Sequence, residues 1–162
     1  MSNTDLEYLR LAYQYAAVWS DDPDTQNGAV LLPTKGVVVC GANRLPFGVS
    51  EEPGRLLRPT KYIYLEHAER DAIYAAAMAG VCTQGAKLYC PWYACPDCAR
   101  AIIQAGIAEV IGHERPFSLT PARWVEPIET ARKMLEEADV KLTVIGGDTG
   151  IAIKFDGKTV LM

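Results

Sequence analysis

The stretch KLYCPWYACPDCARAIIQAGIAEVI, residues 87–111, decides the fold. Its outer segments, Lys87–Cys90 and Ala108–Ile111, are short and apolar, which predicts two β-strands. Between them, Pro96–Ala105 has the length and apolar spacing of a helix, and Gly106 provides a good stop. A strand, a helix and a strand in this order predict an α/β architecture, in which helices cover a central sheet.

The flanking sequence continues this pattern. Downstream, Pro121–Ala138 predicts a helix and Val140–Ile145 a strand. Upstream, two apolar runs, Ala29–Leu32 and Val37–Cys40, surround the turn residues 33–36, which is typical of a β-hairpin. A hairpin makes the sheet mixed. The sequence therefore predicts a three-layer α/β/α sandwich with a mixed sheet.

Two further helices and a second hairpin complete the expected elements. Apolar residues at helical intervals predict a first helix from Leu6 to about Ser20, and the alanine-rich segment Glu66–Ala79 predicts another. Ile151–Phe155 and Thr159–Leu161 predict a small hairpin near the end of the chain. We expect residues 1–162 to form a single domain.

Composition excludes several classes of protein. The sequence has no run near the ~20 apolar residues of a membrane span and no secretory signal, so we expect a cytoplasmic protein. Its five cysteines are an odd number, which argues against a disulfide framework. We expect Cys40, Cys82 and Cys90 to be small core residues. The net charge of −4 argues against a main role in binding nucleic acid.

Two short motifs, His67-Ala68-Glu69 and Cys95-Pro96-Asp97-Cys98, carry the chemistry. The cysteine pair alone is ambiguous, because it fits a redox dithiol, half of a structural zinc site or two unrelated thiols. A structural zinc ion normally takes four protein ligands, but the sequence offers only one other histidine, His113, and no second pair of this kind. His67, Cys95 and Cys98 instead match the three ligands of a catalytic zinc ion.

Glu69 strengthens the catalytic interpretation. Two thiolates and an imidazole leave a zinc ion formally neutral, so its water is less acidic than in an all-histidine site and needs a base nearby. Glu69 lies two residues from His67 and can serve as that base. A His-x-Glu motif followed by Cys-x-x-Cys is typical of zinc deaminases.

At these residues the chain resembles the cytidine deaminase superfamily, and most of all the deoxycytidylate (dCMP) deaminases. The resemblance is carried by CARAIIQAGI at residues 98–107, DPDTQNGA at 22–29 and GAN at 41–43, and it extends over about 6–145. It implies a five-stranded sheet, zinc ligation by the histidine and two cysteines named above, and Glu69 as the proton shuttle.

The resemblance also implies contacts with the substrate. Asn43 would bind the sugar or the base, and the backbone around Ala68 and Cys95 would line the base pocket. Phe117, with His113 beside it, would pack on the base or sugar. It further implies a homo-oligomer, with a hexamer as one form.

The segment Arg44–Leu65 has no clean periodicity, and a structureless segment of this length is often functional. It carries Arg44, Arg55, Arg58 and Lys61, and its ends adjoin Asn43 and the His-x-Glu motif. One interpretation is a solvated surface loop. The other is that some of these cations bind the substrate's 5′-phosphate, for which the planar guanidinium of arginine is well suited.

The sequence therefore favours a zinc-dependent enzyme that converts dCMP to dUMP and ammonia. Deamination of another base remains an alternative, either adenosine in tRNA or a free nucleoside, because Asn43-Arg44 also resembles tRNA adenosine deaminases. The acidic net charge argues against tRNA. A zinc-binding module without activity is the third interpretation, but such a module has no use for Glu69.

Overall fold

Five strands form one mixed sheet in the order β2-β1-β3-β4-β5 in the computed structural model, which describes residues 3–162. β1 pairs antiparallel with β2 and β3, whereas β3, β4 and β5 run parallel. The strands of this sheet are β1 (Gly28–Leu32), β2 (Val39–Ala42), β3 (Lys87–Tyr89), β4 (Glu109–His113) and β5 (Lys141–Ile145). The mixed five-stranded sheet is thus confirmed.

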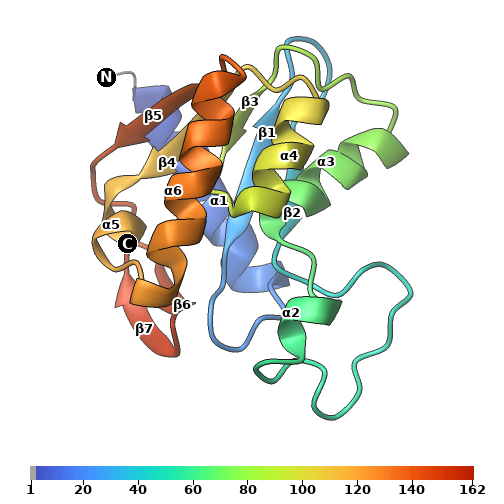
Figure 1. Cartoon of the computed structure of the whole chain (residues 1–162), viewed down its shortest axis with the longest axis vertical. Helices are drawn as coiled ribbons and strands as arrows, with labels where there is room; N and C mark the ends of the chain where they lie inside the picture. Colours follow the sequence, from blue (N-terminus) through green and yellow to red (C-terminus); the bar gives the residue numbers. More distant parts are fainter. Residues whose placement is uncertain (1–2) are drawn as a thin grey trace.

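Helices cover both faces of this sheet (Figure 1). Side chains along a strand alternate between the two faces. Leu88 therefore packs with the helices on one face, and its neighbour Tyr89 with the helix on the other. The first face carries α3 (Ala68–Met78), α4 (Pro96–Gln104) and α6 (Ala122–Glu137), and the second carries α1 (Asn3–Trp19). The three-layer α/β/α sandwich is confirmed.

Some boundaries differ from the sequence prediction. β2 begins at Val39, because Val39 is the residue that pairs with Leu31, and Val37 is 66% exposed in the preceding turn. The segment 44–65, predicted to be structureless, ends in a short helix, α2 (Lys61–Tyr64). A second short helix, α5 (Glu114–Ser118), follows β4 directly and was not predicted.

The expectation of core cysteines is correct for Cys90, which is buried, and for Cys40, which packs against the apolar cluster beneath α1. Cys40 is half-buried, and Cys82 is exposed in the turn between α3 and β3. That turn lies outside both apolar faces of the sheet, so the prediction for Cys82 was wrong.

The predicted second hairpin is present as β6 (Ala152–Phe155) and β7 (Lys158–Leu161), which form a separate two-stranded sheet. Phe155 packs edge-on against Trp92 with ring centroids 4.9 Å apart, and it shares an apolar cluster with Tyr13 of α1. Figure 1 shows the hairpin at the same end of the molecule as the segment 44–65. Among the residues that the structure describes, no helix is long and apolar enough to cross a membrane.

Gly41 of β2 lets α3 pack unusually close to the sheet. A Cβ atom at this position would lie 2.3 Å from the carbonyl oxygen of Ala68 and 2.4 Å from the backbone nitrogen of Ala72. Real Cβ atoms essentially never come so close to backbone atoms. Only glycine allows this spacing, which places the first turn of α3 against the strand.

Candidate active site

Three predicted metal ligands converge at two helix N-termini. His67 is the N-cap of α3, Cys95 is the N-cap of α4, and Cys98 lies in the first turn of α4 after Pro96. The Nδ1 atom of His67 lies 3.5 Å from the Sγ atom of Cys95 and 3.6 Å from that of Cys98. The two sulfur atoms are 3.7 Å apart.

These distances fit a tetrahedral zinc ion. Zn–S and Zn–N bonds of ordinary length with tetrahedral angles require S···S of ~3.8 Å and S···N of ~3.6 Å. The chemistry of the donors agrees, since a hydrogen bond from the Cys98 thiol, followed by one from His67, lowers the pKa of Cys95 to about 3. The same hydrogen bond raises the pKa of Cys98, so Cys95 is the sulfur of this pair that is favoured as a thiolate beside the imidazole.

Glu69 lies beside this triangle in the first turn of α3 and is 2% exposed. Its Oε2 atom is buried without a hydrogen-bond partner, and it is the single side-chain atom in this condition among the described residues. Burial raises the pKa of its carboxyl group. An unpartnered buried carboxyl oxygen is costly, so its presence in a cavity wall indicates a chemical role.

Asn43 connects three parts of the site. Its Oδ1 atom accepts a hydrogen bond of 3.0 Å from the backbone N–H of Ala68, and its Nδ2 atom donates one of 3.0 Å to the carbonyl oxygen of Thr25. The Asn43 side chain lines the cavity, whereas Ala68 is fully buried behind it and does not. Asn43 therefore holds the start of α3 in place at the edge of the cavity.

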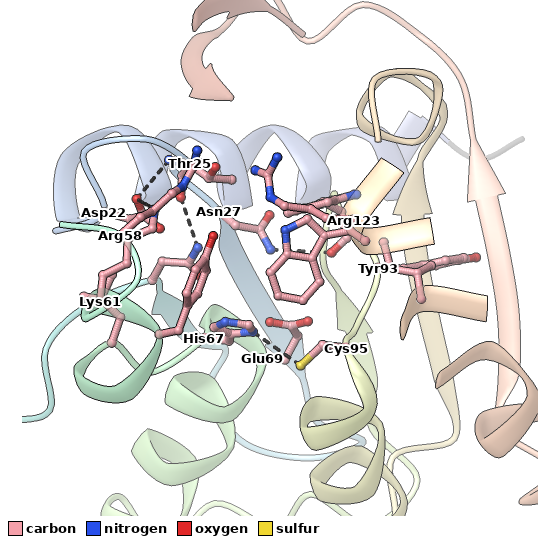
Figure 2. A pocket seen from close by; sticks show the side chains of 16 residues that line it. Asp22, Thr25, Asn27, Arg58, Lys61, His67, Glu69, Tyr93, Cys95 and Arg123 are labelled. Atoms are coloured by element: carbon pink, nitrogen blue, oxygen red, sulfur yellow. Dashed lines mark hydrogen bonds and ion pairs between the residues drawn. The ribbon is translucent and has the colours of Figure 1, made fainter. Parts of the chain in front are cut away.

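The cavity has an empty volume of about 610 Å³, which includes its open mouth. Figure 2 shows His67, Glu69 and Cys95 together on one side, with Arg58 and Arg123 on the opposite side. Sixteen residues line this cavity: Asp22, Thr25, Asn27, Asn43, Arg58, Lys61, Tyr62, Leu65, His67, Glu69, Trp92, Tyr93, Cys95, Arg123, Trp124 and Ile128. One cavity thus contains both the metal-ligand triangle and a group of cations.

Aromatic side chains that the sequence analysis missed form the walls. Trp124 of α6 lies at the centre, with ring centroids 5.9 Å from Trp92, 6.0 Å from Tyr62 and 6.3 Å from His67. The Nε1 atom of Trp92 donates a hydrogen bond of 3.1 Å to Thr120, which fixes its ring. The position of Trp92 between β3 and the cysteine pair was a usable signal, but nothing local marked Trp124.

Phe117, the predicted aromatic contact, packs instead against Tyr93 with ring centroids 4.3 Å apart, and it does not line the cavity. His113 is buried in the core. Its Nε2 atom donates to the carbonyl oxygen of Gly147 at 2.9 Å, and its Nδ1 atom accepts from the hydroxyl of Tyr13 at 2.7 Å. Burial lowers the pKa of His113, in keeping with this neutral, structural role.

The four cations of the segment 44–65 occupy different places. Arg44 forms an ion pair with Asp71 of α3, and Arg55 forms one with Glu52. Neither arginine lines the cavity. Arg58 and Lys61 do line it.

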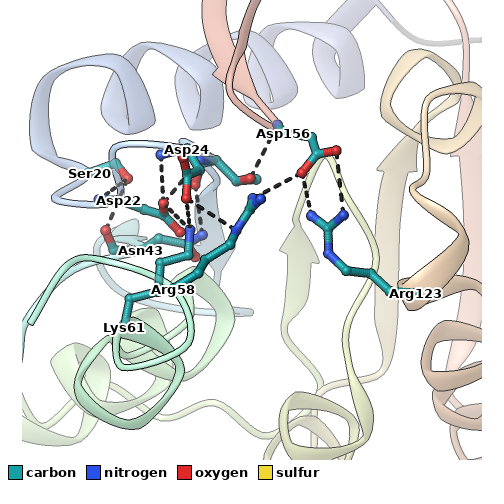
Figure 3. Close-up of polar contacts among 9 residues, drawn as sticks. Ser20, Asp22, Asp24, Asn43, Arg58, Lys61, Arg123 and Asp156 are labelled. Atoms are coloured by element: carbon teal, nitrogen blue, oxygen red, sulfur yellow. Dashed lines mark hydrogen bonds and ion pairs between the residues drawn. The ribbon is translucent and has the colours of Figure 1, made fainter.

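Arg58, Lys61 and a third cation, Arg123 of α6, meet three aspartates at the cavity mouth (Figure 3). We call this group the mouth cluster: Arg58, Lys61, Arg123, Asp22, Asp24 and Asp156. Its three positive and three negative charges balance. Lys61 is 1% exposed and lies 2.6 Å from Asp22, whereas the side chains of Arg58 and Arg123 are 37% and 43% exposed.

Comparison with known proteins places these residues in a family. Residues 2–114 match the model described as the cytidine and deoxycytidylate deaminase zinc-binding region. An uncharacterized deaminase of Aliivibrio fischeri is 36% identical over 77% of this chain and 82% of its own length. Deoxycytidylate deaminase of Mus musculus is 38% identical over 65% of this chain, a match that spans only 62% of the mouse protein.

Solved structures show the same fold. The dCMP deaminase of cyanophage S-TIM5, determined in complex with dCMP and dUMP, superimposes with a TM-score of 0.69 over 90% of this chain and 99% of its own, at 23% identity. Its apo form gives a TM-score of 0.66 at 21% identity. The chain therefore belongs to the family of cytidine and deoxycytidylate deaminases, which are hydrolytic enzymes.

Proposed function

We propose that this chain catalyses the zinc-dependent hydrolysis of dCMP to dUMP and ammonia. The observation that carries the proposal is the buried, unpartnered carboxyl oxygen of Glu69 beside the triangle of His67, Cys95 and Cys98. A carboxyl group in this position can exchange protons with a substrate but contributes little to stability. Similarity to deoxycytidylate deaminases favours dCMP among the possible cytosine substrates.

His67, Cys95 and Cys98 would hold the zinc ion, which would supply the Lewis acidity that makes water nucleophilic at neutral pH. In this proposal Glu69 takes a proton from the attacking water and delivers it to ring nitrogen N3 of cytosine. A second proton passes through Glu69 to the amino group, which leaves as ammonia. Glu69 thus stabilises charge that develops only in the transition state.

The aromatic walls would hold the flat pyrimidine ring, with Trp92 and Trp124 giving apolar contact. Asn43 would bind the sugar or the base. Its amide oxygen has one further lone pair and its amide nitrogen one further proton, beyond the bonds to Ala68 and Thr25.

For the 5′-phosphate, the structure favours Arg58 among the four predicted cations, because Arg58 lines the cavity and is half-exposed. Arg123 offers a second guanidinium from α6. Lys61 is buried in an ion pair with Asp22. This position indicates a structural role for Lys61 and not a contact with the phosphate. We therefore propose that Arg58 and Arg123 together recognise the phosphate.

A substrate panel tests this function. Purified protein with its zinc content measured is given dCMP, deoxycytidine, CMP, dCTP and adenosine, and ammonia release is followed. We expect about one zinc per chain and the highest kcat/KM for dCMP. Ammonia from adenosine alone, or from none of the cytosine compounds at full zinc occupancy, would refute the proposal.

Two variants test the phosphate contact. Arg58→Ala and Arg123→Ala should each reduce the preference for dCMP over deoxycytidine by about 10-fold, the value of one partly exposed charged contact. Arg132→Ala is the matched control, since Arg132 is an ion-paired arginine on the outer surface of the same helix as Arg123. An unchanged preference in both test variants would place the phosphate elsewhere.

A further inference from the structure

Asp156 occupies a fixed position at the tip of the β6–β7 hairpin. It forms a two-residue turn with Gly157, and both have positive φ angles, 48° and 79°. An Asp-Gly pair is well suited to this turn type. The tip is attached to the loop before β1, because the N–H of Gly157 donates to the carbonyl oxygen of Asp24 at 2.8 Å and that of Asp156 to Thr25 Oγ1 at 3.3 Å.

The carboxylate of Asp156 bridges the two arginines of the cavity mouth (Figure 3). Its Oδ1 atom lies 2.9 Å from a terminal nitrogen of Arg58, and both of its oxygens contact the guanidinium of Arg123. Two guanidinium groups around one anion are also the arrangement that binds a phosphate monoester. Asp156 therefore lies where an anionic substituent of a ligand in this cavity would bind.

The bridge is exchangeable. The side chain of Asp156 is 35% exposed, and ion pairs as exposed as these contribute ~0.2–1 kcal/mol each. A phosphate carrying nearly two negative charges can therefore compete with it. The buried pair of Lys61 and Asp22, at 2% and 9% side-chain exposure, contrasts with this and holds the adjacent loop.

We propose that Asp156 is an internal competitor for the phosphate site, and that it sets how strongly the enzyme prefers nucleoside 5′-monophosphates over nucleosides. Phosphate binding displaces the carboxylate from Arg58 and Arg123. This proposal rests on the proposed phosphate role of these arginines. Arg58 lies inside the region 2–114 that matches the family model, whereas Arg123 and Asp156 lie outside it.

The test replaces the carboxylate with a neutral group of the same shape. Asp156→Asn should bind inorganic phosphate and dUMP about 2- to 30-fold more tightly by calorimetry, from the loss of two exposed ion pairs. Binding of deoxyuridine should not change. KM for dCMP should fall by a similar factor while KM for deoxycytidine stays constant.

Asp139→Asn is the matched control. Asp139 is exposed after α6 and, like Asp156, has a positive φ, 57°. Its replacement by Asn removes the same single charge at a position that does not line the cavity. Asp156→Gly is a second test variant, since glycine also accepts the turn geometry. Thermal unfolding reports whether the hairpin remains folded in each variant.

The outcomes separate this inference from the proposed function. Unchanged or weaker phosphate binding in both Asp156 variants, with unchanged thermal stability, would overturn the inference and show that Asp156 positions the arginines or is inert. Because calorimetry with phosphate needs no turnover, tighter binding in these variants would support the competitor role even if the panel found no dCMP deamination. In that case only the proposed substrate would fail.

Discussion

Lys61→Met should destabilise the protein strongly without changing its choice of substrate. Lys61 is 1% exposed, and its Nζ atom lies 2.6 Å from Asp22 and 2.9 Å from Asp24. Removing one partner of a buried ion pair costs ~3–5 kcal/mol, because the other charge remains buried. Asp22 would retain hydrogen bonds from the N–H groups of Asp24 and Thr25, so we expect the lower end, about 3 kcal/mol.

Urea unfolding measures this change in free energy. Lys133→Met, which removes an exposed lysine from α6, should cost less than ~0.5 kcal/mol. Adding Asp22→Asn to Lys61→Met should recover part of the loss, since the residual charge is then gone. A loss no larger than that of the Lys133 control, or a large drop in the preference for dCMP over deoxycytidine, would refute a structural role for Lys61.

Three further outcomes are expected. Glu69→Gln should retain zinc but lose at least ~10²-fold in turnover, and near-native ammonia release would place the base elsewhere. Cys95→Ser should lose zinc by metal analysis, so full occupancy would exclude this ligand set. Burial alone would raise the pKa of Glu109, but hydrogen bonds from Lys141 and Lys87 lower it to about 2, below its ordinary 4.5. Its stabilisation is therefore present above pH ~4.5 and disappears as the pH falls toward 2. The difference in unfolding free energy between wild type and Glu109→Gln should shrink by ~1–3 kcal/mol over that range, and a constant difference would contradict the shift.

The metal-ligand triangle could be predicted because its signals are local. His67, Cys95 and Cys98 each lie at the start of a helix that follows a loop, and parallel strands bring successive helix N-termini to one edge of the sheet. Strand periodicity predicted the mixed sheet in the same way. The register of the strands was harder to predict than their presence. The first residue of β2, for example, is set by its pairing with Leu31 and not by its own apolar character.

The walls and mouth of the cavity could not be predicted, because they are assembled from distant segments. Trp124 and Arg123 reach the cavity from α6, and Asp156 from a hairpin that forms its own sheet. Phe117 was the expected aromatic because it follows the fourth strand. The short helix α5 turns it toward Tyr93, and no sequence pattern indicated that helix.

Gly41 has a consequence for anyone who wishes to redesign this enzyme. This glycine contacts the first turn of α3 on the side that faces the sheet, and it does not line the cavity. The contact nevertheless sets the distance of His67 and Glu69 from the sheet. One added methyl group would lift the helix by a fraction of an ångström and misalign the reacting groups, for which small displacements are costly. Mutagenesis libraries that aim at a new base should therefore vary the aromatic walls and leave this strand untouched.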